Sequence, residues 1–263
     1  MGWRGKLGDL FAFKQDHIFK DWDDVKANAN NRYDAIGELY GPAAWEALKD
    51  KAGKQPIEPG DVCWADLNND GVINNLDRVK VGNLFPTVTG GFSTTLGYKD
   101  FSLYARFDYA LGHTLYNDLA ARSLGQYQGS FNIIDMVKDS WSETNQNTDI
   151  PKFYYADQLS KKNITRSNNG LTAVDNNSSR FYEKGDYLAL REITLTWNLP
   201  KKWINKALMS NASVYVTGQN LFYITGYTGV SPEPAVDTTY GQGLDNGRYP
   251  TPKTVLLGLS VTF

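Results

Sequence analysis

The chain of 263 residues has very few of the side chains that usually build metal centres. Cys63 is its only cysteine, and His17 and His113 are its only histidines. A single cysteine excludes an intrachain disulfide and a cysteine-based metal cluster, and two distant histidines argue against a histidine-rich zinc site. Charged residues are scattered with a net charge of −2 and a pI of about 5.7. Without a basic run, the composition indicates no nucleic-acid partner.

Long apolar runs are also missing. No stretch approaches the roughly 18 consecutive apolar residues of a membrane helix, and the first residues lack the apolar segment of a signal peptide. A membrane-spanning β-strand needs only about 9–11 residues of alternating polarity, so these absences leave a β-barrel open. The aromatic content of 13% and the 24 glycines favour a β-rich protein with long polar loops.

Alternating polarity is the strongest pattern in the chain. In residues 254–263 the odd-numbered positions are all apolar, and the even-numbered positions are Thr, Gly or Ser, with Leu256 as the exception. The same period of two recurs in residues 92–98, 101–109 and 187–199, and more weakly in 7–13 and 212–222. A period of two predicts strands with one apolar and one polar face.

The links between these six predicted strands alternate in length. Lys99-Asp100 is predicted to be a tight hairpin turn, and residues 200–211 a short link with one turn of helix. Residues 14–90, 111–186 and 223–252 are long links. Short turns at one end and long loops at the other are typical of outer-membrane barrels, so we expect the three long segments to be extracellular.

The strand count predicts part of a barrel. Six strands are fewer than the roughly eight of the smallest closed barrels, and an open sheet edge in lipid leaves backbone groups unsatisfied. The predicted fold class is therefore all-β, with residues 1–263 as part of a transmembrane antiparallel β-barrel. A soluble β-sandwich is the alternative, since its strands also alternate, but such long loops are uncommon in compact domains.

One loop has the ligand spacing of a calcium site. Oxygen-bearing groups stand at positions 1, 3, 5, 7, 9 and 12 of a twelve-residue loop, with Gly71 at position 6. These groups belong to Asp66, Asn68, Asp70, Val72 (through its carbonyl), Asn74 and Asp77. We expect a structural Ca²⁺ here; the alternative is a turn whose side chains bind their own backbone. No nucleophile–base pair or metal triad accompanies the loop, so the sequence predicts no enzyme.

Several stretches carry a family resemblance. They are LGDLFAFKQDHIF (7–19), PGDVCWADLNNDGVINNLDRVKVGN (59–83), PTVTGGFSTTLGYKDFSLYARFDYALGHTLYN (86–117), GDYLALREITLTWNLPKKW (185–203), SVYVTGQNLFYITGYTGVSPE (213–233) and YPTPKTVLLGLSVTF (249–263). In order and spacing, the chain resembles the C-terminal part of the SusC/RagA-type TonB-linked outer-membrane transporters of Bacteroidetes. Residues 118–180 are the least distinctive.

The resemblance implies both an architecture and partners. It implies the last strands of a barrel of about 22 strands with a plug in its lumen, located in the cell outer membrane. It also implies import of large nutrients, most often oligosaccharides and sometimes peptides, with a SusD-like surface lipoprotein, the TonB complex and outer-membrane lipid as partners. Because plug, TonB-contacting segment and signal peptide are missing, we expect a truncated reading frame or an excised fragment. The alternative function is a soluble, calcium-stabilised carbohydrate-binding or dockerin-like β module.

Overall fold

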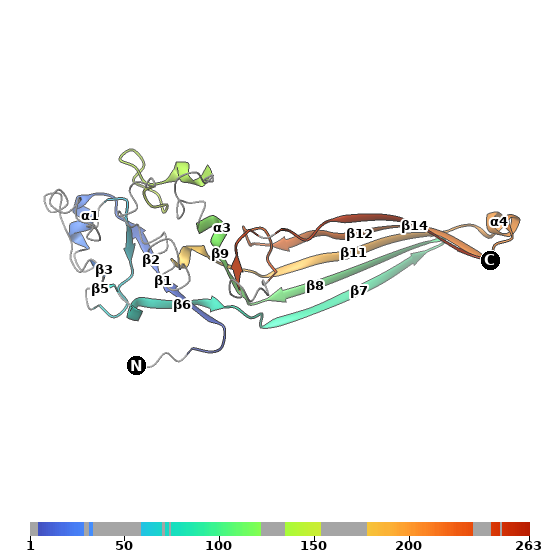
Figure 1. Cartoon of the computed structure of the whole chain (residues 1–263), viewed down its shortest axis with the longest axis horizontal. Helices are drawn as coiled ribbons and strands as arrows, with labels where there is room; N and C mark the ends of the chain where they lie inside the picture. Colours follow the sequence, from blue (N-terminus) through green and yellow to red (C-terminus); the bar gives the residue numbers. More distant parts are fainter. Residues whose placement is uncertain are drawn as a thin grey trace. The chain divides into compact units, whose positions relative to one another are not determined.

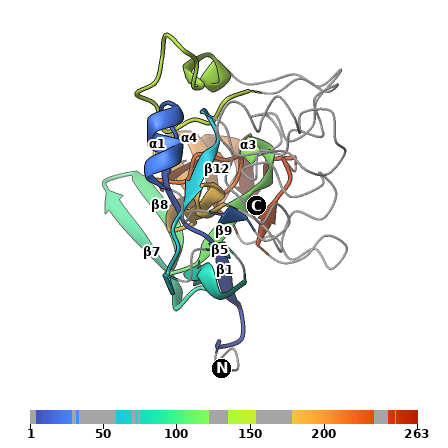
Figure 2. The ribbon, with the colours of Figure 1, turned by 90° about the vertical axis from the view of Figure 1, so that its left-hand side faces the viewer.

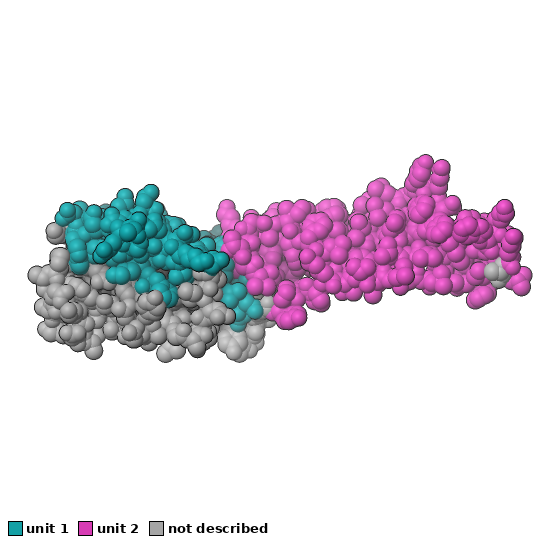
Figure 3. Space-filling model, turned by 90° about the horizontal axis from the view of Figure 1, so that it is seen from above, with its two compact units in different colours: residues 1–84, 116–183, 243–247 teal, residues 85–115, 184–242, 248–263 magenta. Residues whose placement is uncertain are grey.

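The computed structural model describes residues 5–28, 32–33, 59–69, 72–73, 75–121, 135–153, 178–233, 243–247 and 249–263. The chain divides into two compact units. The first comprises residues 1–84, 116–183 and 243–247, and the second residues 85–115, 184–242 and 248–263 (Figure 3). Among the described residues, none of the helices has both the length and the apolar character needed to span a bilayer.

The second unit is built on one antiparallel sheet of five long strands. Their order in the sheet is β14-β12-β11-β8-β7 (Figure 1). The strands are β7 (Val88–Tyr98), β8 (Phe101–Leu111), β11 (Tyr187–Asn198), β12 (Asn211–Thr225) and β14 (Thr254–Thr262). With 9 to 15 residues each, they have the length that a tilted membrane strand requires.

The two short links are as predicted. Tyr98 pairs with Phe101 across the hairpin turn, where Lys99 adopts a positive φ of 52°, the left-handed backbone that tight hairpin turns use. Residues 200–211 contain α4 (Lys201–Ile204) and a 3₁₀ helix over Asn205–Ala207. The C-cap of the 3₁₀ helix is Leu208, whose backbone is in the left-handed region with a φ of 57°.

The first unit consists of short elements around small apolar clusters. Its paired strands are β1 (Asp9–Phe13) with β6 (Arg78–Asn83), β2 (Gln15–Ile18) with β4 (Val62–Trp64), and β3 (Arg32–Tyr33) with β5 (Val72–Ile73). Helix α1 (Trp22–Ala27) begins at Asp21, whose side chain accepts the N–H groups of Asp23 and Asp24. It is the blue helix of Figure 2, and it packs on β4 through Val25 and Cys63.

Further short elements complete the described chain. They are β9 (Thr114–Asn117), α3 (Asp118–Ala121), β10 (Tyr182–Lys184), β13 (Leu244–Asp245), and 3₁₀ helices over Asn75–Asp77, Asp135–Asp139 and Ser179–Phe181. Strands β10, β9 and β13 form a three-stranded sheet in that order.

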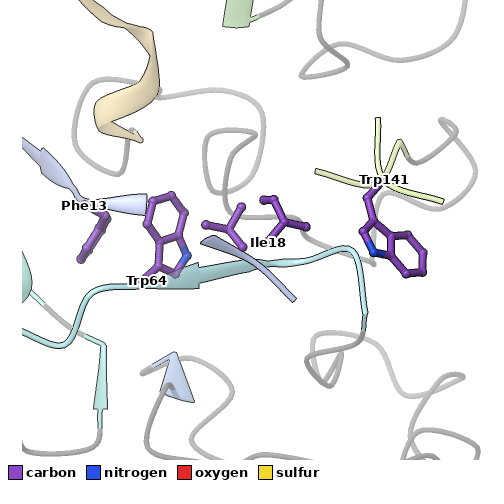
Figure 4. Close-up of a cluster of buried hydrophobic side chains, with 5 residues drawn as sticks. Phe13, Ile18, Trp64 and Trp141 are labelled. Atoms are coloured by element: carbon purple, nitrogen blue, oxygen red, sulfur yellow. The ribbon is translucent and has the colours of Figure 1, made fainter. Parts of the chain in front are cut away.

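Trp64 is the centre of the main apolar cluster of the first unit. It lies between Phe13 and Ile18, with Val62 and Trp141 completing the cluster (Figure 4). The rings of Phe13 and Trp64 are 5.8 Å apart between centroids and tilted by 55°. Because Trp64 is only 2% exposed, most of its large apolar surface is removed from water, which stabilises the first unit.

One strand assignment made from the sequence is wrong. Residues 7–13 do contain a strand, β1, but it pairs with β6 in a separate two-stranded sheet and does not join the five-stranded sheet. The physical reason is visible in its packing, since Ala12 and Phe13 are buried in the first unit. Five of the six predicted strands therefore form the sheet. The extracellular placement of residues 14–90, 111–186 and 223–252 stays a prediction.

Candidate functional site

The five-stranded sheet has one apolar and one polar face along its whole length. Strand register carries the apolar positions across the sheet: Leu257 pairs with Val216, Val216 with Leu195, Leu195 with Leu103, and Leu103 with Leu96. On β14 the side chains of this face are largely exposed, Leu257 at 80% and Leu259 at 65%. Exposed apolar side chains in a continuous band are typical of a lipid-facing surface.

The opposite face carries polar side chains at matching positions. Thr194 pairs with Tyr104 on one side and Thr217 on the other, and the hydroxyl groups of Thr194 and Thr217 are 2.8 Å apart. Next along the strands, Glu192 pairs with Arg106. In a transporter barrel such a face lines the lumen, so this face is the part of the second unit that can meet a polar solute.

A bulge in β11 places one cation among the carboxylates of the polar side. Leu190 pairs with Phe107 and Glu192 with Arg106, so Arg191 is an extra residue relative to β8. A bulged residue leaves the regular alternation, and its side chain can be aimed independently. The Arg191 side chain is 16% exposed and donates from Nε to Asp108 Oδ1 at 2.5 Å.

The same guanidinium holds the segment that follows β12. Arg191 Nη2 donates to Glu233, Nη1 donates to the Tyr223 hydroxyl at 3.1 Å, and that hydroxyl donates to Glu233 at 2.8 Å. The guanidinium carbon also lies 5.5 Å from the centre of the Tyr223 ring, within the range of a cation–π contact. We call Asp108, Arg191, Tyr223 and Glu233 the arginine cluster.

A second contact fixes the same segment. His113 is 1% exposed, and its Nε2 lies 2.8 Å from the carbonyl oxygen of Pro232. A carbonyl only accepts hydrogen bonds, so Nε2 carries the proton. Gly185 allows the close approach of this ring, because a Cβ there would lie 2.2 Å from His113 Nε2. The end of this segment is thus held at two points, at Glu233 by the arginine cluster and at Pro232 by His113.

A hollow of about 520 Å³ lies beside the arginine cluster. The charged side chains in its lining are Arg106, Asp108 and Arg191. Phe92 and Phe107 border it from β7 and β8, but by register they belong to the apolar face, where their rings stack with centroids 5.0 Å apart. The charged groups are therefore what the polar face offers to the hydroxyl or amide groups of a solute. The adjacent charged residues Arg191 and Glu192 interrupt the period of two and could have located the bulge, but they do not indicate which side chains the bulge brings together.

The calcium-like loop is described in part. Asp66 and Asn68 lie between β4 and β5, the backbone of Val72 belongs to β5, and Asp77 ends the following 3₁₀ helix. Asp77 is fully buried, and its Oδ1 accepts the backbone N–H of Leu67 at 2.9 Å. This bond brings the last position of the loop next to the first two. Asp70 and Asn74 lie outside the described residues.

The known proteins to which the chain is similar in sequence are TonB-dependent receptors. No family model matches the chain. It is 32% identical over 243 residues to TonB-dependent receptor P3 of Formosa agariphila, covering 88% of this chain, and 26% identical over 261 residues to TonB-dependent receptor SusC of Bacteroides thetaiotaomicron, covering 98%. In each case the match spans 22% of the relative.

Solved structures agree on the fold. The structure of the RagAB peptide transporter superimposes with a TM-score of 0.60 at 23% identity, over 78% of this chain and 21% of that one. The open-open and closed-closed states of the RagAB peptide importer superimpose with TM-scores of 0.57 and 0.59. These neighbours confirm the predicted all-β class and show that the sheet has the fold of part of a β-barrel.

Two further predictions from the sequence agree with these relatives. TonB-dependent receptors are outer-membrane proteins, as predicted for this chain, and they are receptors and not enzymes. The chain spans about a fifth of the length of the curated relatives that it matches. Its sheet, its two-faced strands and its relatives together show that the chain belongs to the SusC/RagA-like TonB-dependent receptors.

Proposed function

We propose that the chain forms the last strands of a TonB-dependent importer of large nutrients, most often oligosaccharides. The observation that carries the proposal is the sheet with one apolar and one polar face in a chain related along 88% of its length to a TonB-dependent receptor. The apolar face contacts outer-membrane lipid, and the polar face with the arginine cluster borders the lumen. The bacterium is of the Bacteroidetes type, as the relatives' organisms suggest.

Two partners belong to this proposal. A SusD-like surface lipoprotein covers the extracellular loops, and the TonB complex drives import through parts of the receptor outside this chain. The RagAB structures, named as a peptide transporter and a peptide importer, make peptides the second candidate substrate class. The charged groups around the hollow beside Arg191 fit either class, so a transport measurement decides between them.

The gene that encodes the receptor can be deleted in its own bacterium and restored on a plasmid. We expect deletion to abolish uptake of labelled oligosaccharides and to leave uptake of labelled peptides unchanged, with full recovery on complementation. The reverse pattern would replace oligosaccharides by peptides as the substrate. Expression of the chain by itself tests the membrane assignment, because a monodisperse, detergent-free monomer with a cooperative melt would contradict it and favour the soluble module.

We also propose that the loop from Asp66 to Asp77 binds Ca²⁺ as a structural ion. The ligand spacing and the bond from Leu67 to Asp77, which closes the loop, support this proposal. Calorimetric titration with Ca²⁺ is the test, with Asp70→Ala as the variant that lacks one carboxylate. Heat in the wild type that disappears in the variant is the expected result. A wild type without heat would leave the loop held by its own hydrogen bonds.

A further inference from the structure

A bulge in the first unit aligns two neighbouring side chains. In the antiparallel pair of β2 and β4, Gln15 pairs with Trp64 and His17 with Cys63. Two residues of β2 therefore match one step of β4, and Asp16 is the extra residue. Successive residues of a regular strand point to opposite faces, but a bulge allows both to lie on one side. The structure uses this freedom to bring Asp16 and His17 together.

Three different ligand atoms meet at this bulge. A carboxylate oxygen of Asp16, a ring nitrogen of His17 and the Sγ atom of Cys63 all lie within 4.8 Å of one another. Oxygen, nitrogen and sulfur are the ligands that Zn²⁺ accepts, at about 2.0–2.3 Å from the ion. Such distances place two ligand atoms of a tetrahedral ion roughly 3.3–3.7 Å apart. The three atoms, which lie within 4.8 Å of one another, therefore need to move only slightly toward an ion to reach tetrahedral coordination distances.

The surroundings of the three atoms differ from one side to the other. Cys63 is 4% exposed and lies in the cluster with Phe19 and Val25, whereas the Asp16 side chain is 62% exposed. An ion can therefore enter from the solvent side and keep a water molecule as its fourth ligand, while the sulfur holds it from the buried side. Three protein ligands and one water are a common arrangement at open zinc sites.

Asp24 orients the histidine ring. His17 Nδ1 lies 2.9 Å from Asp16 Oδ2, and His17 Nε2 lies 3.2 Å from Asp24 Oδ1. Asp24 belongs to helix α1 and is fixed by residues on either side of the helix, because it accepts the N–H of Lys20 at 2.9 Å and the side-chain amide of Asn28 at 2.8 Å. When Asp24 accepts the Nε2 proton, Nδ1 is unprotonated, and a metal bound by Nδ1 and the Asp16 carboxylate would replace the contact between these two groups.

The local charge also favours a cation. Asp16 and Asp24 place two carboxylates beside the His17 ring. Binding of a divalent ion forms a metal–sulfur bond, releases the thiol proton to water and displaces water from the ion.

We propose that Asp16, His17 and Cys63 form a binding site for Zn²⁺, with Asp24 as the residue that positions His17. The site is separate from the calcium-like loop, whose ligands are oxygen atoms only. It holds β2, β4 and helix α1 together, because its residues belong to these three elements. The two scarcest residue types of the chain, cysteine and histidine, thereby stand opposite each other on paired strands.

Cobalt spectroscopy on the full chain in detergent tests the site. Co²⁺ is the probe, because a cobalt–thiolate bond gives a charge-transfer band in the near ultraviolet. Cys63 is the only cysteine, so such a band reports this site alone. We expect the band to appear with one equivalent of Co²⁺ and to disappear when Zn²⁺ is added. Cys63→Ser should abolish it, and His17→Gln should weaken binding by at least tenfold.

The positioning residue and the control complete the test. Asp24→Asn should keep the band but weaken Co²⁺ affinity roughly 10- to 100-fold, the usual effect of losing a carboxylate that orients a ligand. Asp23→Asn removes the same charge from the same helix outside the cluster and should change affinity less than twofold. Circular dichroism verifies that each variant is folded. A folded wild type without the band, or a band that survives unchanged in His17→Gln, would overturn the proposal.

Discussion

Removal of the Arg191 charge should make local opening of residues 226–233 easier. Arg191→Met keeps the length of the side-chain stem but leaves Asp108 and Glu233 without their shared cation. Truncating one partner of a buried charge pair costs about 2–5 kcal/mol. The two carboxylates are 38% and 32% exposed, so water screens part of the penalty and we expect a value near 2 kcal/mol.

Hydrogen exchange measures this loss directly. A local opening that becomes easier by about 2 kcal/mol exchanges its amides roughly 30-fold faster, since about 1.4 kcal/mol corresponds to a factor of ten. The acceleration should be confined to residues 226–233 and their contacts. The segment should not detach completely, because the bond from His113 to the Pro232 carbonyl remains.

Two further variants decide whether the reasoning is right. The triple variant Arg191→Met, Asp108→Asn, Glu233→Gln has no orphaned charge and should recover more than half of the lost protection. Arg106→Met removes an exposed cation from the same strand pair and should change exchange by no more than about twofold. If the triple variant opens as fast as Arg191→Met, uncompensated carboxylates are not the cause and the charge argument fails.

Three other predictions concern single contacts. Trp64→Ala should lower the free energy of unfolding of the first unit by about 3–5 kcal/mol, measured by urea unfolding, because it empties the centre of the cluster. The pKa of Asp9 is lowered to about 2 by its bonds to Lys80, Asn83 and the backbone of Lys6. The stabilisation of the folded state that results from this lowered pKa is complete above about pH 4 and is lost as the pH falls toward 2. Lys80→Met should flatten the dependence of the unfolding free energy on pH in this acid range. An unchanged dependence would contradict the conclusion that Lys80 lowers the pKa of Asp9. Gly258→Ala should destabilise the sheet, because its Cβ would lie 2.1 Å from the Tyr215 ring, and Tyr215→Ala should relieve the effect in a thermal melt.

Local patterns account for most of what was predicted correctly. The alternation in residues 101–109 and 254–263 depends only on the pleat of a strand, in which neighbouring side chains point to opposite faces. The turn at Lys99-Asp100 follows from its position between two such segments. These features are visible in sequence because each is decided by residues close together in the chain.

Pairing between distant segments was predicted less well. Strand β1 has strand-forming residues, but Asp9 pairs with Asn83 and forms an ion pair with Lys80 at 2.7 Å. That choice of partner depends on residues about 70 positions away. The sequence contains no local signal for it, so residues 7–13 were assigned to the wrong sheet.

The sequence by itself determined the class of protein, the five long strands, their two faces and the short turns between them. Only the tertiary structure decided where the two bulges lie and which side chains they bring together. A bulge depends on how two strands are aligned, and one extra residue changes the direction of a side chain without changing the composition. For this reason the arginine cluster and the group formed by Asp16, His17 and Cys63 could be recognised only once the strands were paired.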